Sequence, residues 1–211
     1  MTPTTTVVPV TAMATSSRIA RAVAVALVLT SAAAVAACGS QAPAATSQAT
    51  PQAFAWLHPS PAPVSWQTTR LPNGPARLAY PGNWRSIQSD AGTRTAALRT
   101  GGGRIKGYLN ATPRQGTETL ANWSSFRVDH NRDEGDTNVK LVASATNLRF
   151  RGAHGSCVID DYTSSSGHHY REIACIAAGA SATTVVVGAA PPRYWQQEHS
   201  ALERSISAFQ T

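Results

Sequence analysis

The second half of the chain alternates apolar and polar residues with a period of two, which is typical of half-buried antiparallel strands. Clusters of Gly, Ser, Asn and Asp, which favour turns, separate most of these runs. The pattern predicts strands at residues 139–145, 148–151, 156–163, 169–177 and 182–189. The first two runs form either one bent strand or a hairpin.

Earlier in the chain, the sequence predicts a strand, a hairpin and a helix. The strand at Arg77–Tyr80 runs into a Pro-Gly-Asn turn, and strands at Thr93–Arg99 and Arg104–Ala111 flank a glycine-rich loop. A helix follows, because Thr117 is suited to cap it and Glu118 to occupy its first turn.

A second helix is predicted to close the chain, opened by Pro191-Pro192. Its apolar residues fall on one stripe, which we expect to cover the sheet, and its two glutamates, Glu198 and Glu203, are expected near solvent. The stripe consists of Trp195, Leu202, Ile206 and Phe209. Taken together, these patterns predict an α+β domain with an antiparallel sheet.

The N-terminus has the pattern of a signal peptide. Two arginines, Arg18 and Arg21, precede the uncharged run Ala22–Ala37. This run is shorter than the about 20 apolar residues that a membrane span needs. Met13 would give a leader of more ordinary length.

The end of this leader, Val35-Ala36-Ala37-Cys38, resembles the bacterial lipobox. The resemblance implies that Cys38 carries a thioether-linked diacylglycerol, in some lipoproteins with further palmitate, and becomes the N-terminus after cleavage. The alternative is an ordinary secretory signal cut near Ala37, with Cys38 unmodified. Because two or more acyl chains anchor a protein stably, lipidation would hold it at the outer face of the cytoplasmic membrane.

The composition divides the chain into three parts: a lipoprotein signal peptide at 1–37, a Pro/Ala/Ser/Thr-rich tether at 38–64, and one globular domain at 65–211. Phe54, Trp56 and Leu57 are unusual for a tether. They are expected either to dock on the domain or to rest on the membrane interface.

The formal net charge of +7 falls to +5 without the two leader arginines, and no run of five like charges occurs. A nucleic-acid partner is therefore not expected outside the membrane. The expected partners are the membrane, reached through the lipid anchor, and an envelope protein, glycan or lipid.

Cys157 and Cys175 are the two cysteines beyond Cys38, and an even pair in an exported protein predicts a disulfide. The spacing supports this pairing, because a three-residue loop, Ser165–Gly167, places the two cysteines directly opposite each other. The result is a disulfide-stapled hairpin.

The same register sets Asp160 opposite Glu172, and like charges at such a pair are unfavourable. Three interpretations remain open: the carboxylates are solvated or compensated by Arg, the register slips, or the pair forms a cation or ligand site.

Sequence patterns of catalysis or metal binding are not found. His154, His168 and His169 lack the spacing of zinc ligands, and the chain has neither a nucleophile elbow nor a P-loop. We therefore expect no catalytic residue, no metal and no cofactor.

The order of elements, together with Tyr80-Pro81-Gly82-Asn83-Trp84, resembles the PsbP/Mog1-like fold over Arg77–Phe209. Actinobacterial lipoproteins of the LpqN type look like members of this group. The resemblance implies an antiparallel sheet sandwiched between helices, and accessory or binding modules rather than enzymes. It supplies no catalytic residue to carry over.

The sequence thus favours a lipid-anchored extracytoplasmic binding or accessory module of the bacterial envelope. The alternative is a cell-envelope enzyme whose site is assembled by the fold near residues 156–177, around Asp160, Glu172 and the histidines.

Overall fold

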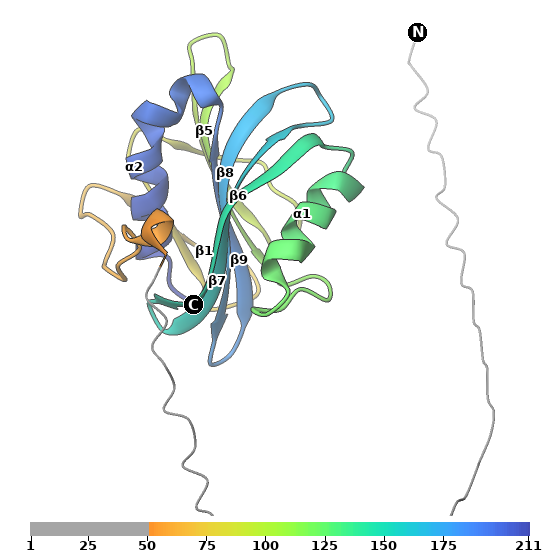
Figure 1. The fold of residues 1–211 in the computed structure, drawn as a ribbon. Coiled ribbons are helices and arrows are strands. Elements are labelled where there is room, and N and C mark those ends of the chain that lie inside the picture. The colour runs from red at the N-terminus through yellow and green to blue at the C-terminus, as the bar shows by residue number, and fades with distance from the viewer. Residues whose placement is uncertain (1–50) are drawn as a thin grey trace, which may run out of the picture. The chain divides into compact units, whose positions relative to one another are not determined.

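The structure of the protein is a computed structural model that describes residues 51–211. In this part of the chain, antiparallel strands form a seven-stranded sheet in the order β3-β4-β5-β9-β8-β7-β6, and β1 and β2 form a separate pair (Figure 1). The strands are β1 (Gln67–Arg70), β2 (Arg77–Tyr80), β3 (Arg85–Ile87), β4 (Arg94–Arg99), β5 (Ile105–Pro113), β6 (Thr137–Phe150), β7 (Ala153–Thr163), β8 (His169–Gly179) and β9 (Thr183–Ala190).

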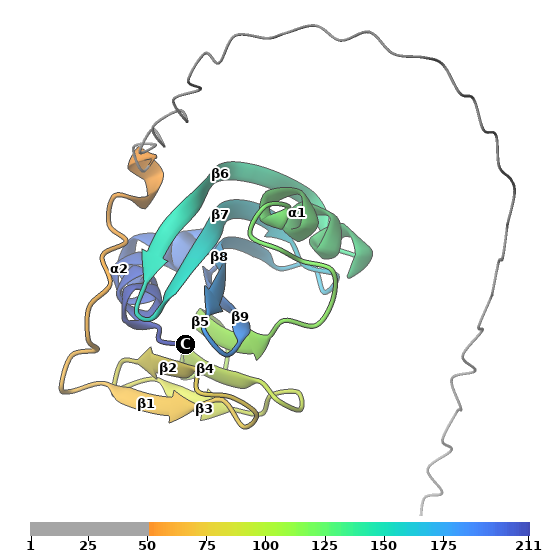
Figure 2. The ribbon, with the colours of Figure 1, turned by 90° about the horizontal axis from the view of Figure 1, so that it is seen from below.

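Two α-helices pack on different parts of the large sheet. Helix α1 (Trp123–Asp133) contacts β6, β7 and β8, whereas α2 (Pro192–Ala208) contacts β9, β5, β8 and β2. They lie on either side of the sheet in Figures 1 and 2. The predicted α+β class with an antiparallel sheet is confirmed.

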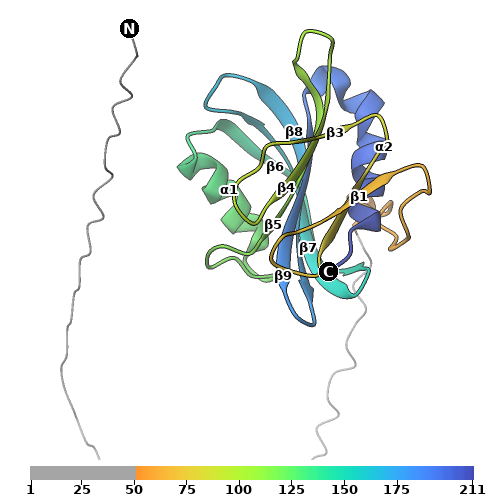
Figure 3. The ribbon, with the colours of Figure 1, turned by 180° about the vertical axis from the view of Figure 1, so that it is seen from behind.

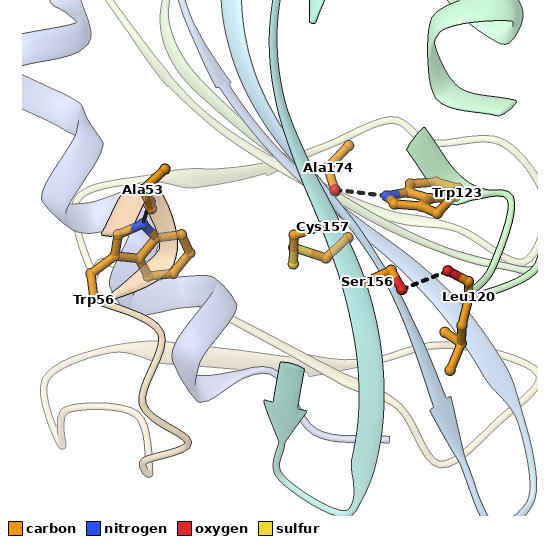
Figure 4. The surroundings of a disulfide bond; sticks show 8 residues. Ala53, Trp56, Leu120, Trp123, Ser156, Cys157 and Ala174 are labelled. Atoms are coloured by element: carbon orange, nitrogen blue, oxygen red, sulfur yellow. Dashed lines mark hydrogen bonds between the residues drawn. A yellow bond between two sulfur atoms is a disulfide. The ribbon is translucent and has the colours of Figure 1, made fainter. Parts of the chain in front are cut away.

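Side-chain alternation along the central strands gives each helix its own apolar surface. Toward α2, Ile173 and Cys175 pack with Leu202 and Ile206 in the larger hydrophobic cluster. Toward α1, Ala174 and Ile176 belong to a second cluster with Val158 and Trp123. Odd-numbered residues of β8 therefore face α2 and even-numbered residues face α1. The indole of Trp123 also donates a hydrogen bond to the carbonyl of Ala174, at 2.9 Å (Figure 4).

The predicted strands largely match those of the structure, but the first helix begins later than predicted. Thr117 does not cap it, because Glu118 turns back to accept hydrogen bonds from the backbone amides of Gln115 and Gly116, and the helix starts at Trp123. The two runs after α1 form one strand, β6, whose pairing with β7 shifts register at three places.

The apolar stripe of α2 is confirmed for Leu202 and Ile206, which are fully buried. Phe209 is also buried but lies just beyond the helix end. The expectation that Glu198 is near solvent is wrong: only 8% of it is exposed, and it forms an ion pair of 3.6 Å with Lys106. Glu203 is half-buried.

Part of the predicted tether packs against the domain. Residues 51–64, which we call the strap, place Phe54 and Leu57 in the larger hydrophobic cluster. Trp56 is partly buried and packs against the same cluster. The amide of Ser60 donates to the carbonyl of Ser207, and Arg204 donates to Ser60 and to Pro61. The aromatic residues of this segment thus dock on the domain.

The strap leads into β1 (Figure 3), a strand that the sequence did not predict. The next strand, β2, contacts α2. Among residues 51–211, no helix has the length and apolar character needed to cross a membrane. The signal peptide and Cys38 lie outside the described residues.

Candidate functional site

The hairpin of β7 and β8 carries the predicted site residues, and its register is the predicted one. Cys157 pairs with Cys175, their Cα atoms are 4.1 Å apart, and the two form a disulfide. Figure 4 shows the disulfide on the side of β7 that faces the strap, with Ser156 and Trp123 on the other side. The predicted disulfide is confirmed, and it joins β7 to β8, the second and third strands from the β6 edge of the sheet.

Three residues further along β7, and on the other face of the hairpin, Asp160 lies opposite Glu172 on the side that faces α1. Both carboxyl groups are buried, with 0% and 1% of their residues exposed. Arg127 of α1 reaches over the sheet and forms an ion pair of 2.6 Å with Glu172, and the hydroxyl of Tyr162 donates to the other carboxylate oxygen at 3.2 Å. Of the three interpretations, compensation by Arg is correct for Glu172. The carboxylates are not solvated, because both are buried, and the register does not slip.

Asp160 is held less completely than Glu172. Asn131 of α1 donates to its Oδ2 at 3.5 Å, and its Oδ1 has no hydrogen-bond partner. Burial, and after it the negative charge of Glu172, raise the pKa of Asp160 from 3.8 to about 8. A protonated Asp160 leaves one negative charge in the cluster, and Arg127 balances it. A cation or ligand at Asp160 and Glu172 stays a prediction.

The sequence did not identify Arg127 and Asn131 as partners of this pair. They are four residues apart, a spacing that places both on one face of a helix. That spacing was the available signal, but it could be used only once α1 was known to lie over β7 and β8.

The opposite side of the same hairpin holds a hollow of about 390 Å³, between the β7–β8 tip and the start of α2. Arg171 forms two hydrogen bonds with Asp161, of 2.7 and 2.8 Å, and its guanidinium lies 5.7 Å from the ring centre of Trp195. Thr163 links two further lining residues: it accepts from Asn138 at 3.2 Å and lies 2.9 Å from Nδ1 of His169. The lining is therefore polar and aromatic.

A second hollow, of about 610 Å³, adjoins the first and shares His169, Tyr170 and Pro192 with it. Three segments of the chain line it: the β4–β5 turn with Gly103–Ile105, the β7–β8 turn with Gly167–Tyr170, and the start of α2 with Pro191–Arg193. Residues so far apart in sequence give no local motif, so sequence analysis missed them. The two glycine turns were the available signal, and Gly103 and Gly167 both have positive φ.

The structure does not bring the predicted histidines and carboxylates together. His169 and Asp161 lie on the α2 side of the hairpin, while Asp160 and Glu172 lie on the α1 side. His154 is at the opposite end of β7 from the tip. In residues 51–211, no three His, Cys, Asp or Glu side chains are grouped closely enough to hold a metal ion.

Comparisons with known proteins give structural likeness without close sequence similarity. No protein family and no curated protein matches the sequence. Cyanobacterial PsbP (CyanoP) from Synechocystis sp. PCC 6803 superimposes with a TM-score of 0.53 at 11% identity, over 71% of this chain and 94% of that chain.

Two further structures are more distant. LpqN, described as involved in cell envelope biogenesis of Mycobacterium tuberculosis, gives a TM-score of 0.37 at 11% identity, over 71% of this chain and 80% of that chain. PA94 from Pseudomonas aeruginosa gives 0.44 at 14% identity, over 67% and 94%. The likeness to CyanoP shows that the chain has a PsbP-like fold.

Proposed function

We propose that this protein is a lipid-anchored, extracytoplasmic binding or accessory module of the bacterial cell envelope. In this proposal Cys38 carries the anchor, the domain stands at the outer face of the cytoplasmic membrane, and the two adjoining hollows at the β7–β8 tip bind its partner. The fold is a PsbP/Mog1-like sandwich of helices around the sheet, of the LpqN type found in actinobacterial lipoproteins.

The observation that carries the binding role is the pair of hollows. They open beside two hairpin tips and the start of a helix, and they are lined by polar, basic and aromatic side chains. A few convergent polar groups beside aromatic rings are typical of ligand sites. The buried disulfide supports an oxidising compartment.

An enzymatic role has less support in this geometry. Asp160 and Glu172 are buried beneath α1 and line neither hollow. A general acid or base must reach its substrate, so Asp160 and Glu172 would need α1 to move.

Replacing the anchor residue tests the proposed location. Cys38→Ala should release the full-length protein from the membrane fraction or leave it unprocessed, because the chain would lack its acyl groups. Cell fractionation followed by mass spectrometry of the N-terminus measures both effects. Thr46→Ala, a change in the same segment, is the control. Processed Cys38→Ala protein that stays on the membrane like wild type would contradict lipid anchoring.

A further inference from the structure

The larger of the two hollows is basic, and nothing in the packing of the fold requires this. Its lining contains the side chains of Arg104, His168, His169 and Arg193, and it contains neither Asp nor Glu. Both arginines are exposed. The hollow therefore collects one guanidinium group from each of two separate segments of the chain, and two imidazoles from a third.

Neighbouring cations are balanced by carboxylates, whereas these two arginines are not. Lys106 is paired with Glu198, and Arg171 is paired with Asp161. In the part of the chain that the structure describes, neither Arg104 nor Arg193 forms an ion pair; Arg193 lies over the ring of Tyr194, 5.1 Å from its centre. Two uncompensated guanidinium groups beside one hollow suit a ligand with negative charge.

The chemistry of the ligand follows from the side chains that line the two hollows. A guanidinium offers a fork of N–H donors that matches the oxygens of a phosphoryl group. The adjoining smaller hollow offers the ring of Trp195 and the side-chain amides of Asn138 and Gln196. Arg171 lies over the ring of Trp195 and His199 stacks with it, so the ring presents its edge to the hollow. An aromatic edge with planar polar groups around it suits a hydroxyl-bearing ring.

We propose that the two hollows together bind a sugar phosphate, free or at the end of an envelope glycan, with its phosphoryl group between Arg104 and Arg193 and its sugar against Trp195. This rests on the proposed function of the hollows as a binding site, and it adds the chemical class of the ligand.

The position of the site favours a glycan over the headgroups of the supporting bilayer. The strap holds the C-terminal part of α2, through Ser60 and Arg204, whereas the hollows lie at its first residues. Helix α2 has 17 residues, so these two ends are about 25 Å apart. In Figure 1 the hairpin tips and the strap accordingly lie toward different ends of the molecule. The site is thus remote from the place where the tether enters the domain.

Calorimetric titration of the full-length protein in non-ionic detergent micelles tests the proposal, with glucose 6-phosphate and glucose as the probes. At low ionic strength, glucose 6-phosphate should bind at least tenfold more tightly than glucose. Arg104→Gln combined with Arg193→Gln should weaken its binding at least tenfold. The control, Arg114→Gln with Arg149→Gln, removes the same charge from exposed positions outside the hollows and should change binding less than twofold.

Two results would overturn the sugar phosphate while leaving a binding module in place. One is equal binding of glucose and glucose 6-phosphate; the other is binding of phosphatidylglycerol, added to the same micelles, but of neither sugar, that is lost in the Arg104/Arg193 variant. No measurable binding of either sugar or of phosphatidylglycerol would overturn both the ligand class and the binding role of the hollows. Because all four arginines are exposed, thermal melts of both variants should match wild type, which separates lost binding from lost folding.

Discussion

At the scale of single residues, Asp160 is a buried carboxyl that is not fully hydrogen-bonded. It lies beside Glu172, and the guanidinium of Arg127 is committed to Glu172. A buried carboxyl without a hydrogen-bond partner at one oxygen is more stable protonated than ionised. The same pair of strands thus holds Asp160, which keeps its proton at neutral pH, beside Glu172, which is paired with Arg127.

This difference predicts how stability depends on pH. The folded state keeps the Asp160 proton up to a pKa of about 8, whereas the unfolded chain loses it near 3.8. The free energy of unfolding should therefore fall as pH rises from about 4 to about 8, and the Asp160 contribution should level off above that range. Asp160→Asn, which stays neutral, should flatten this decline and be more stable than wild type at pH 8.

Urea unfolding at a series of pH values measures the effect. Asp129→Asn is the control, because Asp129 lies on α1 but is exposed, and this variant should keep the wild-type decline. If Asp160→Asn and wild type lose stability in parallel across the range, Asp160 is not the group that titrates.

At the scale of elements, the β7–β8 hairpin combines a glycine turn at its tip with a disulfide midway along its two strands. The sequence predicted both, because cross-strand pairing follows from the loop length once Gly167 is assigned its left-handed conformation. What the sequence could not show is which element covers each face. Glu198 was expected near solvent, but α2 buries it against the sheet, where it pairs with Lys106.

The disulfide should stabilise this hairpin measurably. Replacing both Cys157 and Cys175 with Ala should lower the free energy of unfolding by about 3 kcal/mol, since the bridge closes a loop with a sequence separation of 18. Chemical denaturation with and without reductant measures it: wild type should lose stability in reductant, and the double variant should not respond. Peptide mapping without reduction should find the two segments linked, and free thiols at both positions would contradict the bridge.

Helix α2 provides a second test at this scale. Leu202 is fully buried against the sheet, so Leu202→Ala should cost about 2 to 5 kcal/mol of stability. The neighbouring Glu203, which is half-buried, serves as the matched control, and Glu203→Ala should cost much less. Thermal melts compare the two variants. Equal small shifts would mean that the stripe does not hold the core together.

At the scale of the whole molecule, the sequence identified the order of the elements and an α+β class, because alternation and turn residues are local signals. It placed the start of the domain too late, at residue 65, because Pro and Ala dominate the strap and hide the burial of Phe54. It also missed the larger hollow, whose lining comes from two separate turns and the start of α2. Sites of that kind depend on which loops the topology gathers at one end of a sheet.

The docked strap has a mechanical consequence. A force that pulls on the chain before Pro51 acts first on the packing of Phe54 and the hydrogen bond between Ser60 and Ser207, and only afterwards on β1. We expect the strap to detach from the domain under force before the strand pairs separate, so that it unfolds first and protects the sheet. Under the proposed anchoring at Cys38, this release would lengthen the reach of the domain by the span of residues 51–64, while its disulfide-braced sheet stays intact.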